Sequence, residues 1–277
     1  MSERRVALIT GAAGGIGRAM TSALLADGHA VAAVDRDAAA LDQLTQLGGQ
    51  HGARERLHPI VADLQSQRSC EDAVATAAKQ FGAVDAVFNN AGIGMSSIRP
   101  DAEARYPTIE ELGPDIWDPF LAIFVRAPVT ITRAALPEMK RRGWGRIVNN
   151  TTSYLTMLRV LPYGAAKAAF ESISAVWAKE LDGTGITVNV LVPGGPTDTA
   201  LIADESGWAR DKMLRPEIMG APARWLMSRA ADGFTGQRIT AARWDTSLAE
   251  PDAAQRASRA IGWPELTGDA VWLQGSE

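Results

Sequence analysis

The residues of this sequence best suited to chemistry lie at positions 149–170, in the stretch NNTTSYLTMLRVLPYGAAKAAF. Tyr163 and Lys167 stand four residues apart in an Ala-rich segment that should be helical, and this spacing puts both side chains on one helix face. An ammonium beside a phenol favours the phenolate, whose reference pKa is about 10. A tyrosine with a lowered pKa suits proton transfer to or from an alcohol or carbonyl oxygen. The spacing alone is a weak signal, because most such pairs are ordinary helix surface.

The composition excludes several function classes. The chain has 277 residues, 46% of them apolar, which is enough for a sizeable core. A net charge of −4 without a Lys/Arg stripe argues against nucleic acid as a partner. No apolar run approaches ~18 residues, the N-terminus lacks a signal-peptide core, and Cys70 has no second cysteine to pair with. We therefore expect a cytoplasmic protein without a membrane span or a metal site.

The first 36 residues have the order of a dinucleotide-binding unit. An apolar run at residues 6–9 predicts a buried strand, and the glycine-rich turn TGAAGGIG follows it directly. A helical pattern at residues 16–27 leads to a second strand at 30–34, which ends in Asp35. Such glycines allow close approach of a pyrophosphate to a helix N-terminus. Asp35 lies 18 residues after Gly17, where a carboxylate can bind ribose hydroxyls.

Helices and strands continue to alternate along the chain. This alternation predicts one α/β domain with a doubly wound parallel sheet of the Rossmann type and right-handed crossovers. Pro128 should kink or split the helix expected at residues 115–142. Further strands are expected at residues 57–61, 84–88, 146–149 and 187–192, and further helices at 37–47, 69–81 and 165–181.

Seven motifs follow one another along residues 4–239. They are TGAAGGIG at residues 10–17, Asp35, Asp63-Leu64, NNAG at 89–92, GRIVN at 145–149, Tyr163-x-x-x-Lys167 and Pro193-Gly194. In these motifs and their order the chain resembles the short-chain dehydrogenase/reductase family. The resemblance implies a Rossmann-type sheet with the active site at the carboxyl ends of its strands.

The resemblance also implies cofactor contacts. Asp35 favours NAD over NADP, because a carboxylate repels a 2′-phosphate, although Arg36 beside it complicates that preference. Relatives often hold the nicotinamide carboxamide with a backbone N–H at the position of Pro196, which has none, so Thr197 is favoured for this role over Thr199. The cofactor-binding residues implied are Gly11, Gly15, Ile16, Gly17, Asp35, Arg36, Asp63, Leu64, Asn90, Ala91, Gly92, Tyr163, Lys167, Pro193, Gly194 and Thr197.

The resemblance makes Tyr163 the general acid/base and Lys167 the residue that lowers its pKa. Alignment of GRIVN puts Thr152 where the family's catalytic serine stands, with Ser153 as the second choice. A threonine hydroxyl can donate and accept as serine does, but its β-branch restricts the rotamer. The alternative is that these hydroxyls only satisfy backbone groups at a strand end. Phe124 occupies the position of the family's relay asparagine and offers no hydrogen bond.

The substrate side is less constrained. The loops at 94–112, 154–161 and 200–219 suggest a pocket for an apolar or aromatic alcohol or ketone, lined by some of Met95, Tyr154, Met157, Leu158, Trp208, Met213 and Leu214. Arg159 is expected in solvent. Residues 245–277 form a C-terminal extension, with a helix expected at 251–261, that should pack on the pocket or on a neighbouring subunit.

The leading hypothesis is an NAD-dependent oxidoreductase that interconverts a secondary alcohol and a ketone. Many relatives are tetramers, so a homotetramer or homodimer is expected. The alternative is a dinucleotide-binding protein with weakened catalysis that acts through interactions. The departures at Thr152 and Phe124 keep that alternative open.

Overall fold

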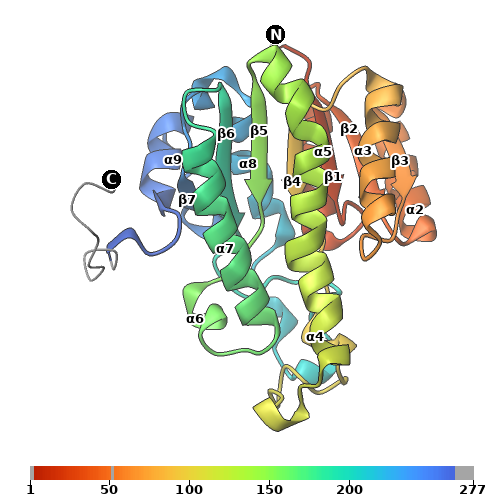
Figure 1. The fold of residues 1–277 in the computed structure, drawn as a ribbon, viewed down its shortest axis with the longest axis vertical. Coiled ribbons are helices and arrows are strands. Elements are labelled where there is room, and N and C mark those ends of the chain that lie inside the picture. Colours follow the sequence, from red (N-terminus) through yellow and green to blue (C-terminus); the bar gives the residue numbers. More distant parts are fainter. Residues whose placement is uncertain (1–2, 51–52, 266–277) are drawn as a thin grey trace.

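The short apolar runs of the sequence form the strands of one central sheet (Figure 1). The computed structural model describes residues 3–50 and 53–265, and within them the strand order is β3-β2-β1-β4-β5-β6-β7-β8. The first seven strands are parallel, as predicted, and β8 is antiparallel to β7. The strands are β1 Val6–Thr10, β2 Ala30–Asp35, β3 Leu57–Val61, β4 Ala86–Asn89, β5 Gly145–Asn149, β6 Ile186–Val192, β7 Gln237–Thr240 and β8 Ser258–Ala260.

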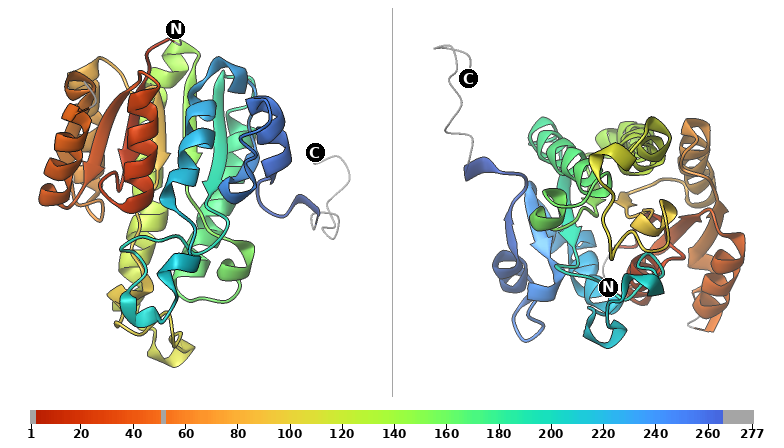
Figure 2. Two further views of the ribbon diagram at one scale, coloured as in Figure 1. Left: turned by 180° about the vertical axis from the view of Figure 1, so that it is seen from behind. Right: turned by 90° about the horizontal axis from the view of Figure 1, so that it is seen from below.

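Helices cover both faces of the sheet, which confirms the doubly wound fold. Helices α3, α5 and α7 lie on the face toward the viewer in Figure 1, and α1, α2 and α8 lie on the face seen in the left view of Figure 2. Each face buries its own large hydrophobic cluster against the sheet. The helices are α1 Gly15–Ala26, α2 Ala38–Gln50, α3 Gln67–Phe81, α4 Pro114–Leu121, α5 Ala127–Arg142, α6 Tyr154–Met157, α7 Tyr163–Glu180, α8 Gly220–Met227 and α9 Glu250–Ala257.

The helix expected at residues 115–142 is interrupted just before Pro128. Between α4 and α5 the backbone forms a π-helical turn over Ala122–Arg126. Proline has no N–H to donate to the carbonyl four residues earlier, so the regular α-helical ladder cannot continue unchanged there. The stretch Pro114–Arg142 is long and apolar enough to cross a membrane by composition, but half of its most apolar window is buried in the domain, as in a core helix.

The helix expected at residues 251–261 is shorter than predicted. Helix α9 ends at Ala257, and Ser258–Ala260 instead forms β8, paired antiparallel with β7. Helical periodicity could not reveal this change, because the backbone groups of β7 provide hydrogen-bond partners that only the folded sheet presents. Residues 266–277 of the predicted extension lie outside the described residues.

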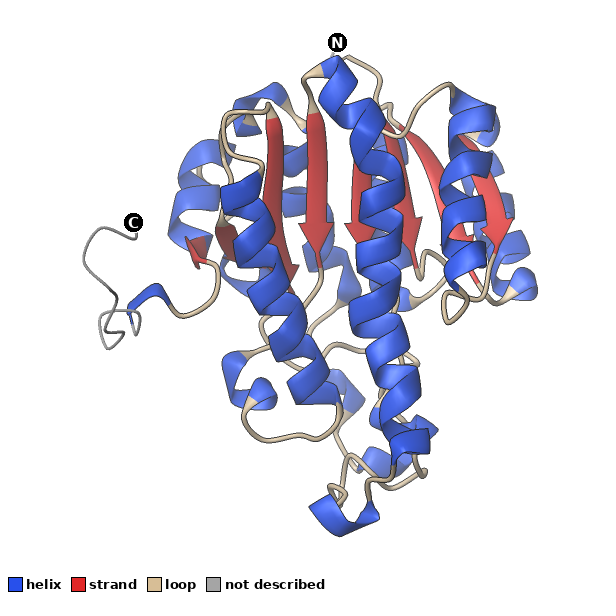
Figure 3. Cartoon of the chain, viewed as in Figure 1, coloured by secondary structure: helices blue, strands red, loops and turns tan. Residues whose placement is uncertain are grey.

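Three long loops gather at the carboxyl ends of the strands. The arrows in Figure 1 point toward the end of the domain where α4 and α6 lie, and the right view of Figure 2 looks onto that end. Figure 3 shows that this end is built mostly of loops and short helices. The loops follow β4, β5 and β6, so residues from distant parts of the sequence meet there.

Candidate active site

The glycine-rich turn between β1 and α1 brings the backbone close to the loop after β4. Gly11 has a φ of +63°, and a Cβ there would lie 2.8 Å from the Cα of Ala91. A Cβ at Gly15 would lie 2.6 Å from the side chain of Thr199. Side chains at these two positions would therefore push apart the turn, the β4 loop and the β6 loop.

The N-terminus of α1 fits an anionic group. Its N-cap residue is Gly14, and no side chain caps the helix. The N–H groups of the first turn have no intrahelical acceptor, and the helix dipole is positive at this end. These backbone groups fit the pyrophosphate of a dinucleotide, the role predicted for Gly15, Ile16 and Gly17.

Asp35 faces the glycine turn from the end of β2. Its carboxylate accepts hydrogen bonds from the backbone N–H of Ala13 at 3.1 Å and of Asp37 at 3.2 Å. Arg36 is exposed beside it. At the end of β3, Asp63 is exposed and Leu64 is buried. Asp35 thus contacts the glycine turn directly, and Asp63 and Leu64 follow the neighbouring strand β3.

A polar network joins the ends of β1, β4 and β5. The Thr10 hydroxyl accepts hydrogen bonds from the backbone N–H of Asn90 at 2.9 Å and of Ala91 at 3.0 Å. The Asn90 amide donates to the Thr10 carbonyl, and the Asn150 amide donates to the Asn90 side chain, both at 3.0 Å. Thr10 and Asn150 therefore fix the loop with Asn90, Ala91 and Gly92. Both residues stand within recognisable motifs, but no local sequence signal indicates that they fix this loop.

Lys167 is buried with its amine held by the end of β5. Its Nζ donates to the Asn150 carbonyl at 2.6 Å and lies 4.2 Å from the ring centroid of Phe124. Among the residues that the structure describes, no acidic side chain forms an ion pair with it. Burial therefore lowers the pKa of Lys167 to about 7.

Tyr163 begins α7, one turn before Lys167 on the same face. Burial raises the pKa of its phenol to about 12, while a hydrogen bond with the Thr152 side chain acts in the opposite direction. The Lys167 amine lies 5.8 Å from the Tyr163 ring centroid and is turned to Asn150. The chain by itself therefore does not lower the tyrosine pKa as the spacing suggested.

The two candidate hydroxyls before Tyr163 have different partners. The Thr152 side chain hydrogen-bonds Tyr163. Ser153 is the N-cap of α6, where its hydroxyl accepts from the backbone N–H of Thr156 at 3.0 Å. The structure therefore brings Thr152, and not Ser153, to the tyrosine.

Phe124 fills the space beside this pair. It lies in the π-helical turn, is almost fully buried, and packs edge-on against Tyr163 with ring centroids 5.3 Å apart. A Cβ at Gly92 would lie 3.1 Å from its ring. Phe124 thus offers Lys167 an aromatic face where a polar side chain would offer a hydrogen bond.

The loop after β6 starts at Pro193 and turns at Gly194, whose φ is +106°. The Thr197 hydroxyl donates to the Gly195 carbonyl at 3.1 Å, and the residue is buried. Thr199 instead lies against the glycine turn at Gly15. Both threonines predicted as carboxamide ligands therefore lie in this loop, and Thr199 is the one in contact with the turn.

The predicted substrate residues do not share one environment. Met95, Met157 and Met213 are buried, whereas Leu158 and Trp208 are exposed. The Tyr154 hydroxyl donates to the Gly262 carbonyl at 2.7 Å. This hydroxyl is therefore already engaged within the protein. Arg159 is exposed, as expected, 5.9 Å from the Tyr106 ring centroid.

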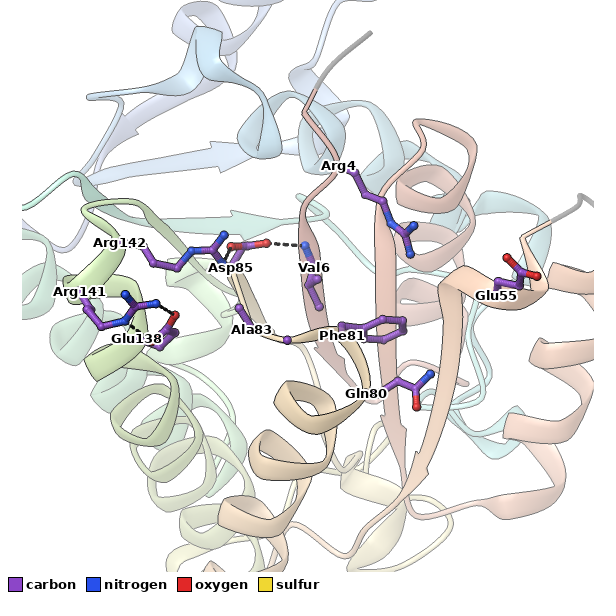
Figure 4. A pocket seen from close by; sticks show the side chains of 11 residues that line it. Arg4, Val6, Glu55, Gln80, Phe81, Ala83, Asp85, Glu138, Arg141 and Arg142 are labelled. Atoms are coloured by element: carbon purple, nitrogen blue, oxygen red, sulfur yellow. Dashed lines mark hydrogen bonds and ion pairs between the residues drawn. The ribbon is translucent and has the colours of Figure 1, made fainter.

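The opposite end of the sheet carries an open cavity of about 610 Å³ (Figure 4). Its charged lining is largely paired internally. Arg142 contacts Asp85 at 2.6 Å, and Arg141 contacts Glu138 at 2.6 Å. None of the predicted site residues lines it.

Cys70 is buried in α3, and burial raises the pKa of its thiol to about 11, which makes it a poor nucleophile. Over residues 3–50 and 53–265, no group of three or more His, Cys, Asp or Glu side chains is arranged to hold a metal ion.

Comparison with known proteins assigns this arrangement to a family. The family model described as short chain dehydrogenase matches residues 5–209. The chain belongs to the short-chain dehydrogenase family. It is 36% identical over 194 residues to the D-threitol dehydrogenase of Mycolicibacterium smegmatis, covering 69% of this chain and 70% of that one. It is 34% identical over 199 residues to the D-beta-hydroxybutyrate dehydrogenase of Cupriavidus necator, covering 70% and 71%.

A solved structure is similar over most of the fold. The 3-ketoacyl-(acyl-carrier-protein) reductase of Brucella melitensis complexed with NADH has a TM-score of 0.70 and 28% identity, covering 84% of this chain and 94% of that one. The protein is accordingly an oxidoreductase of a family that binds a nicotinamide dinucleotide and acts on hydroxyl groups of small molecules.

Proposed function

We propose that the protein is an NAD-dependent dehydrogenase that interconverts a secondary alcohol and a ketone, with Tyr163 as the general acid/base. The observation that carries the proposal is the grouping of three side chains at the carboxyl end of the sheet: Tyr163 at the start of α7, the buried Lys167 one helical turn later, and the Thr152 side chain, which acts on the pKa of the phenol. Tyrosine, threonine and lysine side chains there can exchange a proton with a substrate oxygen.

The residues present fit a dinucleotide. The N–H groups at the start of α1 would hold the pyrophosphate, Asp35 the adenosine ribose, and the Asn90–Gly92 loop the part toward the nicotinamide. When bound, the nicotinamide supplies or accepts a hydride. Thr197 remains the predicted carboxamide ligand, with Thr199 as the alternative that the contact with Gly15 supports.

Each catalytic side chain has one task in this proposal. The Tyr163 hydroxyl gives a proton to the ketone oxygen, or takes one from the alcohol. The Thr152 hydroxyl orients that oxygen by a second hydrogen bond. Lys167, fixed by the Asn150 carbonyl, holds a proton next to the tyrosine and, when charged, stabilises the phenolate.

The preference for NAD over NADP rests on Asp35. Its carboxylate is held toward the glycine turn by Ala13 and Asp37, where it would repel a 2′-phosphate. We expect kcat/KM to be about 10-fold or more higher with NAD, and Asp35→Ser to reduce that ratio by a similar factor. Kinetics with both cofactors measure it, and an NADP preference in the unmodified protein would contradict the proposal.

The remaining expectations are also proposals. The buried methionines of the loops support an apolar or aromatic substrate. The single cysteine supports a cytoplasmic location. Val129 on α5 and Val176 on α7 are exposed, which supports a homotetramer or homodimer assembled through those helices. Light scattering in solution would test the assembly, and a monomeric mass would contradict it.

The decisive experiment measures turnover of a panel of apolar ketones and secondary alcohols by NADH absorbance. The matched variant Tyr163→Phe removes only the hydroxyl. We expect it to lower kcat by about 10²- to 10⁴-fold while calorimetric NADH binding changes little. If NADH binds and no substrate is turned over, the protein is better described as a dinucleotide-binding protein that acts through interactions.

A further inference from the structure

A buried ion pair lies behind the hydroxyl-rich turn and has no role in the proposed mechanism. Arg238 of β7 and Glu171 of α7 are in contact at 2.6 Å, with side-chain exposures of 4% and 0%. Removing two charges from water costs free energy that their attraction often fails to recover. Stability alone is therefore a weak explanation for this pair.

Arg238 holds the main chain next to the catalytic hydroxyl. Its Nη1 donates to the Thr151 hydroxyl at 2.9 Å, and its Nη2 donates to the Thr152 carbonyl. The Thr151 hydroxyl in turn donates to Glu171 at 2.7 Å. Two consecutive residues of the turn are thus fixed to one buried pair.

Glu171 extends the same network to the C-terminal segment. Its second carboxylate oxygen accepts from the backbone N–H of Gly262 at 3.3 Å and lies 3.3 Å from the Tyr154 hydroxyl, whose proton goes to the Gly262 carbonyl. Arg238 lies 4.4 Å from the Tyr154 ring centroid, and Trp263 packs on that ring at 5.7 Å. The segment after β8 therefore closes the network from the outside.

The side chain at position 152 explains why such support matters. A β-branched threonine has few χ1 choices, so its hydroxyl follows any shift of its main chain. A serine could turn back toward Tyr163 after the same shift. The arrangement with Thr152 therefore depends on a fixed backbone more strongly than an arrangement with serine would.

We propose that Arg238 and Glu171 are positioning residues, which hold the Thr152 main chain so that its hydroxyl stays on Tyr163, with Gly262 and Trp263 completing the support. The proposal rests on the proposed dehydrogenase function. It assigns the C-terminal segment a part in catalysis that requires no contact with substrate.

The test uses Glu171→Gln combined with Arg238→Met, because removing one partner alone would leave a buried charge that can unfold the chain. The matched control is Arg146→Met combined with Asp232→Asn. Arg146 is also a buried strand arginine paired with an aspartate, but it lies at the amino end of β5. Thr152→Ser is made in both the unmodified protein and the Glu171/Arg238 double variant.

We expect the Glu171/Arg238 variant to lose about 10-fold or more in kcat, since a misplacement of about 1 Å can cost ~10²-fold. The KM for the cofactor should stay within about twofold. Thr152→Ser should raise kcat in the double variant and recover most of the loss. The measure is the ratio of kcat with Thr152→Ser to kcat without it, which should be several-fold higher in the double variant than in the otherwise unmodified protein. The Arg146/Asp232 control should keep its kcat.

A second readout does not depend on turnover. The chain has three tyrosines, so tyrosine labelled with ¹³C at Cζ gives three signals that Tyr→Phe variants assign. The Tyr163 signal should shift in the Glu171/Arg238 variant in the same direction as in Thr152→Val, while Tyr106 stays unchanged.

An unmoved Tyr163 signal overturns the proposal, whether or not kcat falls. Equal losses of kcat in the variant and the control, or no recovery with Thr152→Ser, overturn it as well. If the unmodified protein turns over no substrate, the dehydrogenase assignment fails, and the Tyr163 signal still decides whether the pair positions Thr152.

Discussion

Two buried charges at opposite ends of the central sheet, Asp85 and Lys167, have opposite kinds of surroundings. At the amino end, the Asp85 carboxylate accepts from the Val6 N–H at 2.8 Å and from Arg142 at 2.6 Å. At the carboxyl end, Lys167 is buried with a backbone carbonyl and an aromatic ring as its main contacts. One sheet therefore carries a compensated charge at one end and an uncompensated one at the other.

This difference separates structural from chemical roles better than the presence of a cavity does. An open cavity of about 610 Å³ lies at the amino end, yet most of its charged side chains satisfy one another. The carboxyl end keeps a cation whose pKa burial has brought to about 7, where a proton can be exchanged at neutral pH. An uncompensated group is costly to bury, and such a cost is typical of functional sites.

The largest expected difference between the two ends is in the kinetic effect of removing one cation from each, Lys167 or Arg142. We expect Lys167→Met to lower kcat by about 10²-fold or more, because it removes the proton-holding group beside Tyr163. Arg142→Met should leave kcat within about twofold and lower the free energy of unfolding by about 1–3 kcal/mol, because the buried Asp85 carboxylate loses a hydrogen-bonding partner. Steady-state kinetics and urea unfolding of both variants measure this. Similar kinetic losses would remove the distinction between the two ends.

A smaller effect is expected at the ring that covers Lys167. Phe124→Asn supplies a hydrogen-bonding group in place of an aromatic face, so we expect kcat to rise about threefold or more, by easier proton exchange at Lys167. The same change should lower the free energy of unfolding by roughly 2–4 kcal/mol through lost packing. Phe124→Leu serves as the control, with a loss of packing and no gain in kcat. A rise in both variants would attribute the gain to loosened packing.

The smallest effect is a pH dependence of stability. The ordinary lysine pKa is 10.5 and that of Lys167 is about 7, so between these values the unfolded chain binds a proton that the folded chain does not. The free energy of unfolding therefore rises with pH in that window, and the penalty is fully present below pH 7. Between pH 7 and 9 the unmodified protein should gain up to about 1.4 kcal/mol per pH unit relative to Lys167→Met. Urea unfolding at several pH values measures this. The prediction is contradicted if the free energy of unfolding changes with pH in the same way in both proteins.

Local patterns were enough to predict the parallel sheet and the glycine turn. The turn, α1 and Asp35 are close in sequence, and strands such as β1 and β6 are marked by mostly apolar runs that are buried throughout. Tyr163 and Lys167 were placed together correctly because helical spacing fixes neighbours. Their pKa values were not predictable, since these depend on burial and on the direction of the Lys167 amine.

Polar contacts between residues far apart in the chain could not be predicted from the sequence. Arg238 and Glu171 are 67 positions apart, and nothing local distinguishes them from surface charges. The sequence also could not decide between Thr152 and Ser153. The difference between them arises because the Ser153 hydroxyl caps α6 by accepting from the Thr156 N–H. Helical periodicity predicts a helix that continues to residue 261, past the observed end of α9 at Ala257, because the pairing of β8 with β7 is a tertiary contact.

The two outermost strands of the sheet also limit how the chain can associate. β3 carries Pro59 in its middle, which cannot donate a ladder hydrogen bond to an incoming strand. On the other side, β8 is three residues long and includes the exposed Arg259, so it offers little template for strand addition. Neither edge therefore invites edge-to-edge aggregation, and the proposed homo-oligomer would have to assemble through the helical faces.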